Sequence, residues 1–179
     1  MLKAMWKSLY KEKSKNTTAV LKENILFQDL TPRELKLVMG TIHIRDYRSD
    51  ETIFHQGQTG FGMYIIEHGK VSISLKKSPL ADSDEQTTLA VLQAGDFFGE
   101  LALVEEGGKR SASAKAVSDT TLIGFFKPNL LDIIERSPST GVKIALRLND
   151  VLGKRLIETN NSVTILNEKL KERQNGEIH

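Results

Sequence analysis

The residues best suited to chemistry are concentrated in one stretch, from Gly99 to Ala112. Gly99 allows the backbone close to a ligand, and a helical turn starting at Glu100 would point free N–H groups toward an anion. Ten residues later, Arg110 could bind a phosphate through two hydrogen bonds, and Ser111 adds a hydroxyl donor. Glu100 is a poor anion ligand but can accept hydrogen bonds from sugar hydroxyls. These residue types predict a site for a sugar phosphate carrying one negative charge.

The same residues also permit a simpler interpretation. A glutamate and an arginine ten positions apart could form nothing more than a salt bridge at the protein surface. The spacing between Glu100 and Arg110 does not separate the two hypotheses. The secondary structure that positions the two side chains must therefore be considered as well.

Short strands are predicted on both sides of this stretch. Val71, Ile73 and Leu75 alternate with polar residues, which indicates a strand with one buried face. The other strand candidates are Ile42–Tyr47, Thr52–His55, Met63–Ile66, Thr87–Leu92, Ser111–Val117 and Thr121–Phe126. Arg110 would then stand at the start of a strand, and the polar segment 77–86 would form a hairpin loop. Many short strands with regular turns predict an all-β roll or barrel.

Short helices are expected before and after these strands. Thr31, Pro32 and Glu34 form a helix start with a capping box, and this helix should end near Thr41. Pro128–Arg136 predicts a second short helix, which the following Ser-Pro pair stops. The strands are therefore expected to lie between helical segments.

The N-terminal segment is basic and amphipathic. Its apolar residues recur at helical spacing: Leu2, Met5, Trp6 and Leu9. Residues 1–15 carry a net charge of +4, and because the whole chain carries +2, the remainder carries −2. A helix in this segment could pack on its own domain or on a partner subunit. Alternatively, it could contact a membrane surface or dock a partner protein.

One long helix is predicted at the other end of the chain. From Ser139 to about Arg173 there is no proline, and a helix of this length would span about 50 Å. Its heptad core positions are Val142, Asn149, Leu156, Val163 and Leu170, alternating with Ala145, Leu152, Thr159 and Leu166. This spacing predicts a coiled-coil seam, most simply a parallel homodimer through residues 139–173. The alternative is a long helix that lies on its own β-roll.

Composition narrows the class of protein. A length of 179 residues fits one domain with helical extensions, which we divide into 1–17, 18–138 and 139–179. The absence of cysteine excludes disulfides, thiolate nucleophiles and cysteine-based zinc sites. No apolar run approaches the ~18 residues of a membrane span, so a cytoplasmic protein is expected. The mildly acidic bulk gives no indication of DNA binding.

The stretch resembles the phosphate-binding cassette of the cyclic-nucleotide-binding domain family. The family pattern F-G-E-(L/I)-A-L, a variable turn and R-(S/T/A)-A stands here as residues 98–103 and 110–112. The similarity extends over about residues 25–160 and is strongest to the effector domain of bacterial catabolite-activator-type regulators. It implies an α+β fold that is mainly β: an antiparallel β-roll or jelly-roll, short N-terminal helices and a long C-terminal dimerisation helix.

The same resemblance implies roles for individual residues. Glu100 would accept a hydrogen bond from the ribose 2′-OH, and Arg110 would hold the cyclic phosphate. The rest of the cradle would be Gly99, Leu101, Ala102, Ser111 and Ala112. Thr159 and Asn160 on the long helix would contact the purine, although they could instead only set the helix register or remain solvated. The resemblance favours cAMP over cGMP as the regulatory ligand and implies no metal.

The leading hypothesis is a stand-alone, dimeric cyclic-nucleotide sensor for signal transduction. Because the chain ends just past the long helix, we expect no helix-turn-helix domain, and the signal would pass through that helix to an unknown effector protein. The alternative is a nucleotide-independent interaction module with the same fold. An enzyme is not expected, because no histidine stands in a metal-ligand spacing such as H-x-H or H-E-x-x-H.

Overall fold

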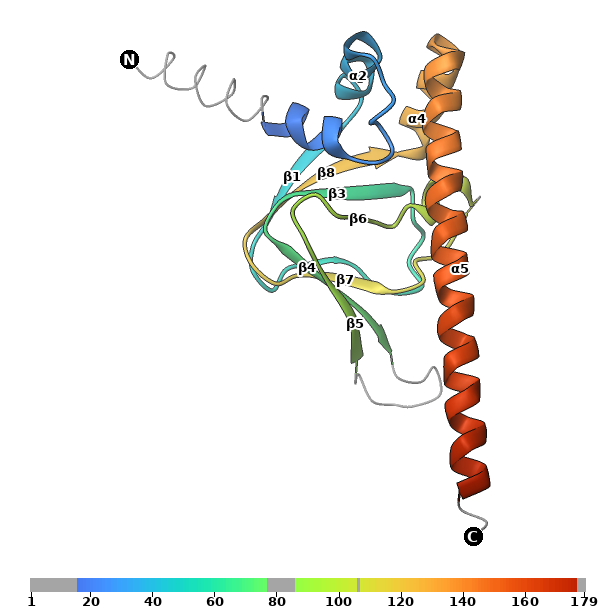
Figure 1. Ribbon diagram of the computed structural model, residues 1–179. Coiled ribbons are helices and arrows are strands. Elements are labelled where there is room, and N and C mark those ends of the chain that lie inside the picture. The colour runs from blue at the N-terminus through green and yellow to red at the C-terminus, as the bar shows by residue number, and fades with distance from the viewer. Residues whose placement is uncertain (1–15, 77–85, 106, 177–179) are drawn as a thin grey trace.

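The computed structural model describes residues 16–76, 86–105 and 107–176 (Figure 1). The predicted amphipathic helix in the first dozen residues lies outside the described residues. So does the predicted loop 77–86, apart from Gln86, which begins a strand.

The strands form two four-stranded antiparallel sheets, which confirms the predicted β-roll. One sheet has the order β1 (His43–Tyr47), β8 (Thr120–Phe126), β3 (Gly62–His68) and β6 (Phe97–Phe98). The other has the order β2 (Thr52–Phe54), β7 (Ser113–Ala116), β4 (Lys70–Lys76) and β5 (Gln86–Gln93). Each predicted strand has a counterpart here. The sequence did not predict β6, because two residues are too few to show a periodicity.

One strand boundary differs from the prediction in a way that affects the site. β7 begins at Ser113, so Arg110 and Ser111 precede the strand and do not start it. The backbone N–H of Arg110 donates to the carbonyl of Gln58 (2.7 Å), and the Arg110 carbonyl accepts from the N–H of Gly57 (2.8 Å). Arg110 is therefore anchored to the loop that follows β2.

The predicted single buried face of β4 is wrong at Ser74, which is buried. Between Ile73 and Ser74 the partners on β5 change from Ala90 to Thr88, so Leu89 is an extra, bulged residue. The Ser74 hydroxyl is satisfied by the Gln86 side chain at 2.7 Å. Bulges often redirect a side chain beside a binding site, and Leu89 here lines the cavity described below.

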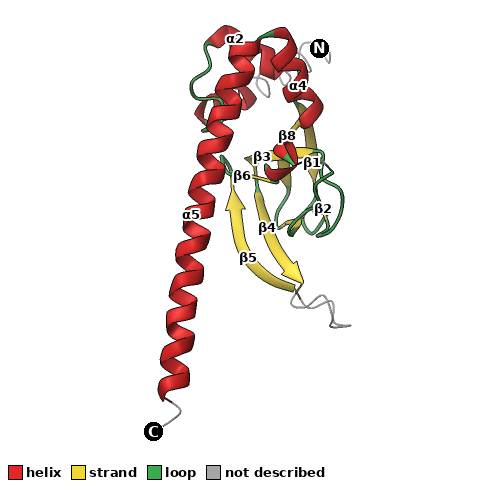
Figure 2. Cartoon of the chain, turned by 90° about the vertical axis from the view of Figure 1, so that its right-hand side faces the viewer, coloured by secondary structure: helices red, strands yellow, loops and turns green. Residues whose placement is uncertain are grey.

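Helices occupy one end of the roll and one side of it (Figure 2). Residues 16–23 are helical, followed by α2 (Pro32–Met39), α3 (Leu101–Val104), α4 (Lys127–Arg136) and α5 (Pro138–Gly176). The predicted capping box of α2 is confirmed. The Thr31 hydroxyl accepts from the Glu34 N–H at 3.3 Å, and the Glu34 carboxylate accepts from the Thr31 N–H at 2.7 Å.

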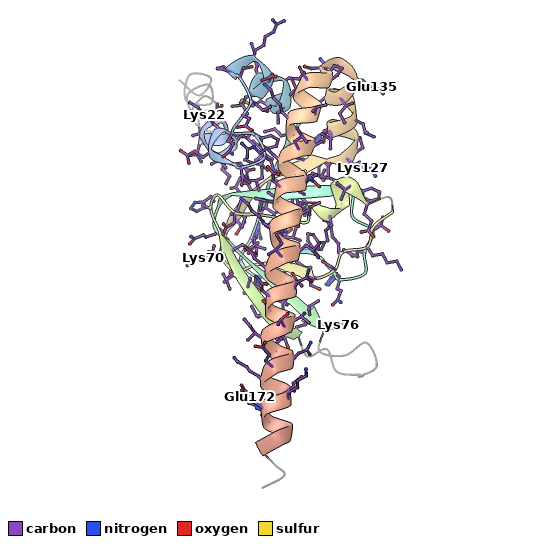
Figure 3. The ribbon with its side chains drawn as sticks, turned by 45° about the vertical axis from the view of Figure 1, so that its right-hand side comes forward. Lys22, Lys70, Lys76, Lys127, Glu135 and Glu172 are labelled. Carbon is purple, nitrogen blue, oxygen red and sulfur yellow. The ribbon has the colours of Figure 1, made fainter. Side chains whose placement is uncertain are left out.

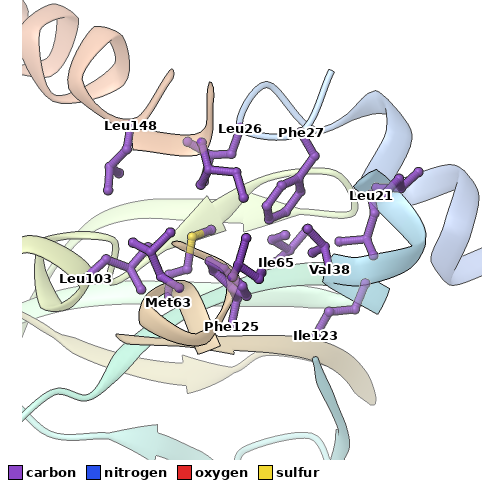
Figure 4. Packing of buried hydrophobic residues seen from close by; sticks show 14 of the residues in the cluster. Leu21, Leu26, Phe27, Val38, Met63, Ile65, Leu103, Ile123, Phe125 and Leu148 are labelled. Carbon is purple, nitrogen blue, oxygen red and sulfur yellow. The ribbon is translucent and has the colours of Figure 1, made fainter. Parts of the chain in front are cut away.

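The main hydrophobic core lies between the helices and the sheet that contains β3 and β8 (Figure 4). Leu21 comes from the N-terminal helical segment, Phe27 from the turn that follows it, Met63 and Phe125 from the sheet, and Leu148 from α5. The ring of Phe27 meets Phe125 edge-on, with centroids 5.6 Å apart. A smaller cluster fills the roll itself. The core thereby fixes the first turns of α5 against the roll.

The second half of α5 extends past the roll, as the position of Glu172 beyond Lys76 shows (Figure 3). Val151 is the last buried residue of the helix, and residues 153–173 are exposed. The 39 residues of α5 correspond to about 58 Å, so the predicted long helix is confirmed. Among the described residues, no helix is long and apolar enough to cross a membrane.

Candidate functional site

A cavity of about 700 Å³ lies between the predicted cassette and α5. Of the predicted site residues, the following line it: Gly99, Glu100, Leu101, Ala102, Arg110, Ser111, Ala112 and Thr159. Asn160 does not line it. The fold therefore brings together residues of the cassette with a residue of α5 that lies about fifty positions further along the chain.

Glu100 is the N-cap residue of α3, but its side chain makes no capping hydrogen bond. Its carboxylate is instead buried in the cavity wall, where Oε1 accepts from Arg155 Nη1 at 2.5 Å. Oε2 is also buried and has no hydrogen-bond partner among the described residues. An unsatisfied buried carboxylate oxygen is costly, so this atom fits a ligand that brings a donor such as a hydroxyl.

Arg110 is 8% exposed and supplies the positive charge of the cassette. Its Nη1 donates to the Gly99 carbonyl at 3.1 Å, and its guanidinium carbon lies 4.1 Å from the centre of the Phe54 ring. Burial lowers the pKa of Arg110, because a charged guanidinium loses solvation away from water. The α3 helix has only four residues and little dipole, so this side chain is the main attraction for an anion.

Gly99 has a positive φ of 76°, and a Cβ at this position would overlap Arg110 Nη1. A Cβ at Gly60 would lie 3.0 Å from Arg110 Nε. The sequence predicted a close approach of a ligand to the backbone of Gly99, and in the structure the group that lies against this glycine is the side chain of Arg110. The two glycines thus leave a slot that the guanidinium fills.

Glu100 and Arg110 do not form the surface salt bridge of the simpler interpretation. Both side chains are buried, and the ion-pair partner of Glu100 is Arg155 on α5. Arg155 also donates to the Phe97 carbonyl at 3.3 Å, and its guanidinium lies over the Phe97 ring. Arg155 is not among the residues predicted for the site from the sequence. Its position four residues before Thr159, on the same helix face, was the available signal.

The α5 wall of the cavity is polar. Besides Thr159, it includes Glu158 and Ser162. The hydroxyl of Thr159 donates to the Arg155 carbonyl at 2.8 Å, and that of Ser162 to the Glu158 carbonyl at 2.9 Å. Among the described residues, no group of three or more histidine, aspartate or glutamate side chains could hold a metal ion.

Comparisons with known sequences show which family of proteins this chain is similar to. The family model for the cyclic nucleotide-binding domain matches residues 44–137. The cyclic AMP receptor protein of Thermus thermophilus is 36% identical over 146 residues, which are 82% of this chain and 63% of that protein. The cAMP-activated global transcriptional regulator of Salmonella typhimurium is 30% identical over 139 residues, which are 78% of this chain and 62% of the relative. The chain thus spans less than two thirds of these relatives.

Solved structures show the same similarity. The catabolite activator protein of Thermus thermophilus superposes with a TM-score of 0.69 at 34% identity, covering 80% of this chain and 63% of that one. The N-terminal domain of a transcriptional regulator from Streptomyces coelicolor gives 0.64 at 26% identity, covering 80% and 94%. The family model covers more than half of the chain, and the cassette residues surround one cavity. The chain therefore belongs to the cyclic nucleotide-binding domain family.

Proposed function

We propose that this protein is a cyclic-nucleotide sensor that binds cAMP, or alternatively cGMP, in the cavity between the cassette and α5. One observation carries the proposal: buried Glu100 has a free oxygen, and buried Arg110 makes one hydrogen bond to the described protein. A ligand with one hydroxyl donor and one anionic group would satisfy both. The names of the relatives favour cAMP.

The cavity walls suggest how the ligand would lie. The guanidinium of Arg110 and the hydroxyl of Ser111 would hold the cyclic phosphate, which carries a single negative charge. Glu100 Oε2 would accept the ribose 2′-OH. The base would then point to α5, where Thr159 lines the cavity.

A homodimer through α5 is part of the proposal. The apolar seam residues of the heptad are exposed in the single chain, by 50–62% for Val142, Leu156, Val163, Leu166 and Leu170. Burying such a seam against a second copy is favourable. Asn160 flanks the seam and would face the base in the cavity of the partner subunit, which accounts for its absence from the cavity of its own chain.

The ligand would act by joining two parts of the molecule. It contacts the cassette through Glu100 and Arg110, and α5 through Thr159, so it stabilises the arrangement in which both are correctly placed. A change in the position or order of α5 would then reach an effector protein.

Calorimetric titration of the full chain with cAMP, cGMP, a cyclic dinucleotide and 5′-AMP tests the proposal. We expect binding of a cyclic mononucleotide and at least tenfold weaker binding of 5′-AMP, whose phosphate carries a second charge that one arginine does not neutralise. Equal affinity for cAMP and 5′-AMP, or no binding of either cyclic mononucleotide, would contradict it.

A nucleotide-independent interaction module is the second candidate, because the exposed seam of α5 could bind another protein without any ligand. A thermal-shift measurement separates the two functions. A ligand at 100 times its dissociation constant stabilises the folded state by about 2.7 kcal/mol. The interaction module predicts no shift with any nucleotide.

A further inference from the structure

The orientation of the Arg110 guanidinium needs an explanation. An arginine side chain loses considerable rotamer entropy when it is fixed, and bidentate phosphate binding requires its plane to be aligned before the ligand arrives. Among the described residues, the guanidinium makes a single hydrogen bond, from Nη1 to the Gly99 carbonyl. One bond at one end of the group does not define the plane.

An aromatic ring supplies the missing constraint. Phe54 is the last residue of β2, and its ring centre lies 4.1 Å from the guanidinium carbon of Arg110. The next ring, Tyr64, is farther away at 5.8 Å. A flat guanidinium stacks well on an aromatic face, and the attraction increases when water is excluded.

Phe54 is itself held by neighbouring rings. Its centroid lies 6.2 Å from that of Tyr64 and 5.8 Å from that of Phe98, and the planes of Phe54 and Tyr64 differ by 28°. Tyr64 and Phe98 are paired residues of β3 and β6, and Phe54 is paired with Ala114 of β7. The ring under Arg110 is therefore fixed by both sheets.

The slot is closed beside this ring by the backbone of Gly60 and Gly99, where a Cβ would press on the guanidinium. We propose that Phe54 is a positioning residue, which fixes the plane of the Arg110 guanidinium so that it can bind the cyclic phosphate. This inference rests on the proposed function of the cavity. It assigns to Phe54 an effect on ligand affinity that acts through Arg110.

The test is a double-mutant cycle in the full chain, with calorimetric titration of cAMP and cGMP. Phe54→Leu removes the ring, and Phe54→Met is a second ring-free variant in case the first does not fold. We expect affinity to fall by about 3- to 30-fold, the range for a desolvated cation–π contact. In the background of Arg110→Gln, which has no cation, the same substitution should change affinity by less than about twofold.

Phe27→Leu is the matched control, because it removes a buried ring that contacts Phe125 and not Arg110. It should lower thermal stability and leave affinity unchanged, whereas Phe54→Tyr, which keeps the ring, should retain affinity. Phe54→Leu with unchanged affinity would overturn the proposal. So would an equal loss in the Arg110→Gln background, because Phe54 would then act on the fold and not through Arg110.

A spectroscopic readout keeps this inference distinct from the proposed function. In the ligand-free protein, the Hε resonance of Arg110, assigned by its loss in Arg110→Gln, should be shifted upfield by the Phe54 ring. The shift should disappear in Phe54→Leu and persist in Phe27→Leu. If wild-type protein bound no cyclic nucleotide, the proposed function would fail, and this resonance alone would decide whether Phe54 orients Arg110. An Hε shift unaffected by Phe54→Leu would overturn the inference in either case.

Discussion

Arg155 Nη1 lies 2.5 Å from Glu100 Oε1, so a side chain of α5 contacts the carboxylate at the start of α3 directly. The glutamate side chain is 6% exposed and the arginine side chain 45%. The pair therefore links the part of the chain that would hold the ligand to the helix that would transmit its signal. One oxygen of Glu100 accepts a hydrogen bond from Arg155 of α5, and the other has no partner among the described residues and could accept one from the ligand.

Arg155→Ala should destabilise the protein, because it leaves the buried carboxylate of Glu100 without its cation. Breaking a fully buried pair costs about 3–5 kcal/mol, and the partial exposure of Arg155 reduces the expected loss to about 1–3 kcal/mol. Urea unfolding at pH 7 measures it. Arg136→Ala is the control, since its pair with Asp132 is exposed on both sides and should contribute less than about 0.5 kcal/mol. An equal loss of stability in Arg155→Ala and Arg136→Ala would show that the pair with Glu100 contributes no more than an exposed ion pair.

Arg110→Ala should weaken cyclic-nucleotide binding by about 2–5 kcal/mol, because the phosphate would enter a buried site without its counter-charge. Calorimetry measures the affinity, and circular dichroism checks that the fold is kept. Lys109→Ala is a suitable neighbour for comparison, since Lys109 lines the same cavity but is exposed, and we expect a change of less than about 1 kcal/mol. Wild-type affinity in Arg110→Ala would show that Arg110 does not bind the phosphate.

The sequence predicted the β-roll, and eight of the nine candidate residues that it singled out line the cavity, because the signals were local. The alternation of apolar residues such as Val71 and Ile73 with polar residues predicts a strand. The resemblance of residues 98–103 and 110–112 to the family pattern predicts a cassette within one short stretch. The structure confirms the fold and collects the cassette around a cavity. The contact of Asn160 with a base stays a prediction, because it depends on a second copy of the chain.

The features that sequence reasoning missed depend on contacts between distant segments. Arg155 meets Glu100 across 55 positions, and Phe54 meets Arg110 across 56, and neither pair has a periodic spacing that reveals it. The bulge at Leu89 arises from the pairing of β4 with β5, which a strand pattern alone does not encode. These positions follow from the assembled sheets and from the packing of α5.

The ion pair of Glu34 with Lys143 makes stability depend on pH. The hydrogen bond from Lys143, supported by the Thr31 N–H, lowers the pKa of Glu34 from 4.5 to about 2. A carboxyl whose pKa is lower in the folded state stabilises the protein above pH 4.5 and loses this effect as the pH falls toward 2. The amide of Glu34→Gln keeps the capping box, so this variant removes the ion pair alone.

We expect the free energy of unfolding of wild type to be higher than that of Glu34→Gln by about 1 kcal/mol at pH 7, allowing for the partial exposure of Lys143. Urea unfolding should show a much smaller difference in stability near pH 2, where about half of the Glu34 carboxyl is protonated in the folded state. A difference that does not vary between pH 7 and pH 2 would contradict this.

The seam of α5 makes the last prediction, which concerns assembly. Leu156 and Ile157 are adjacent and almost equally exposed, at 62% and 61%, but only Leu156 is a core position of the heptad. Leu156→Glu would place two charges against each other in a paired seam, whereas Ile157→Glu would remain in water. Light scattering coupled to gel filtration should therefore find wild type and Ile157→Glu as dimers and Leu156→Glu as a monomer at micromolar concentration. A dimer that survives Leu156→Glu would place the interface elsewhere. A monomeric wild type would mean that the exposed apolar residues of α5 bind a different protein. Asn160 could then not contact a base in the cavity of a partner subunit.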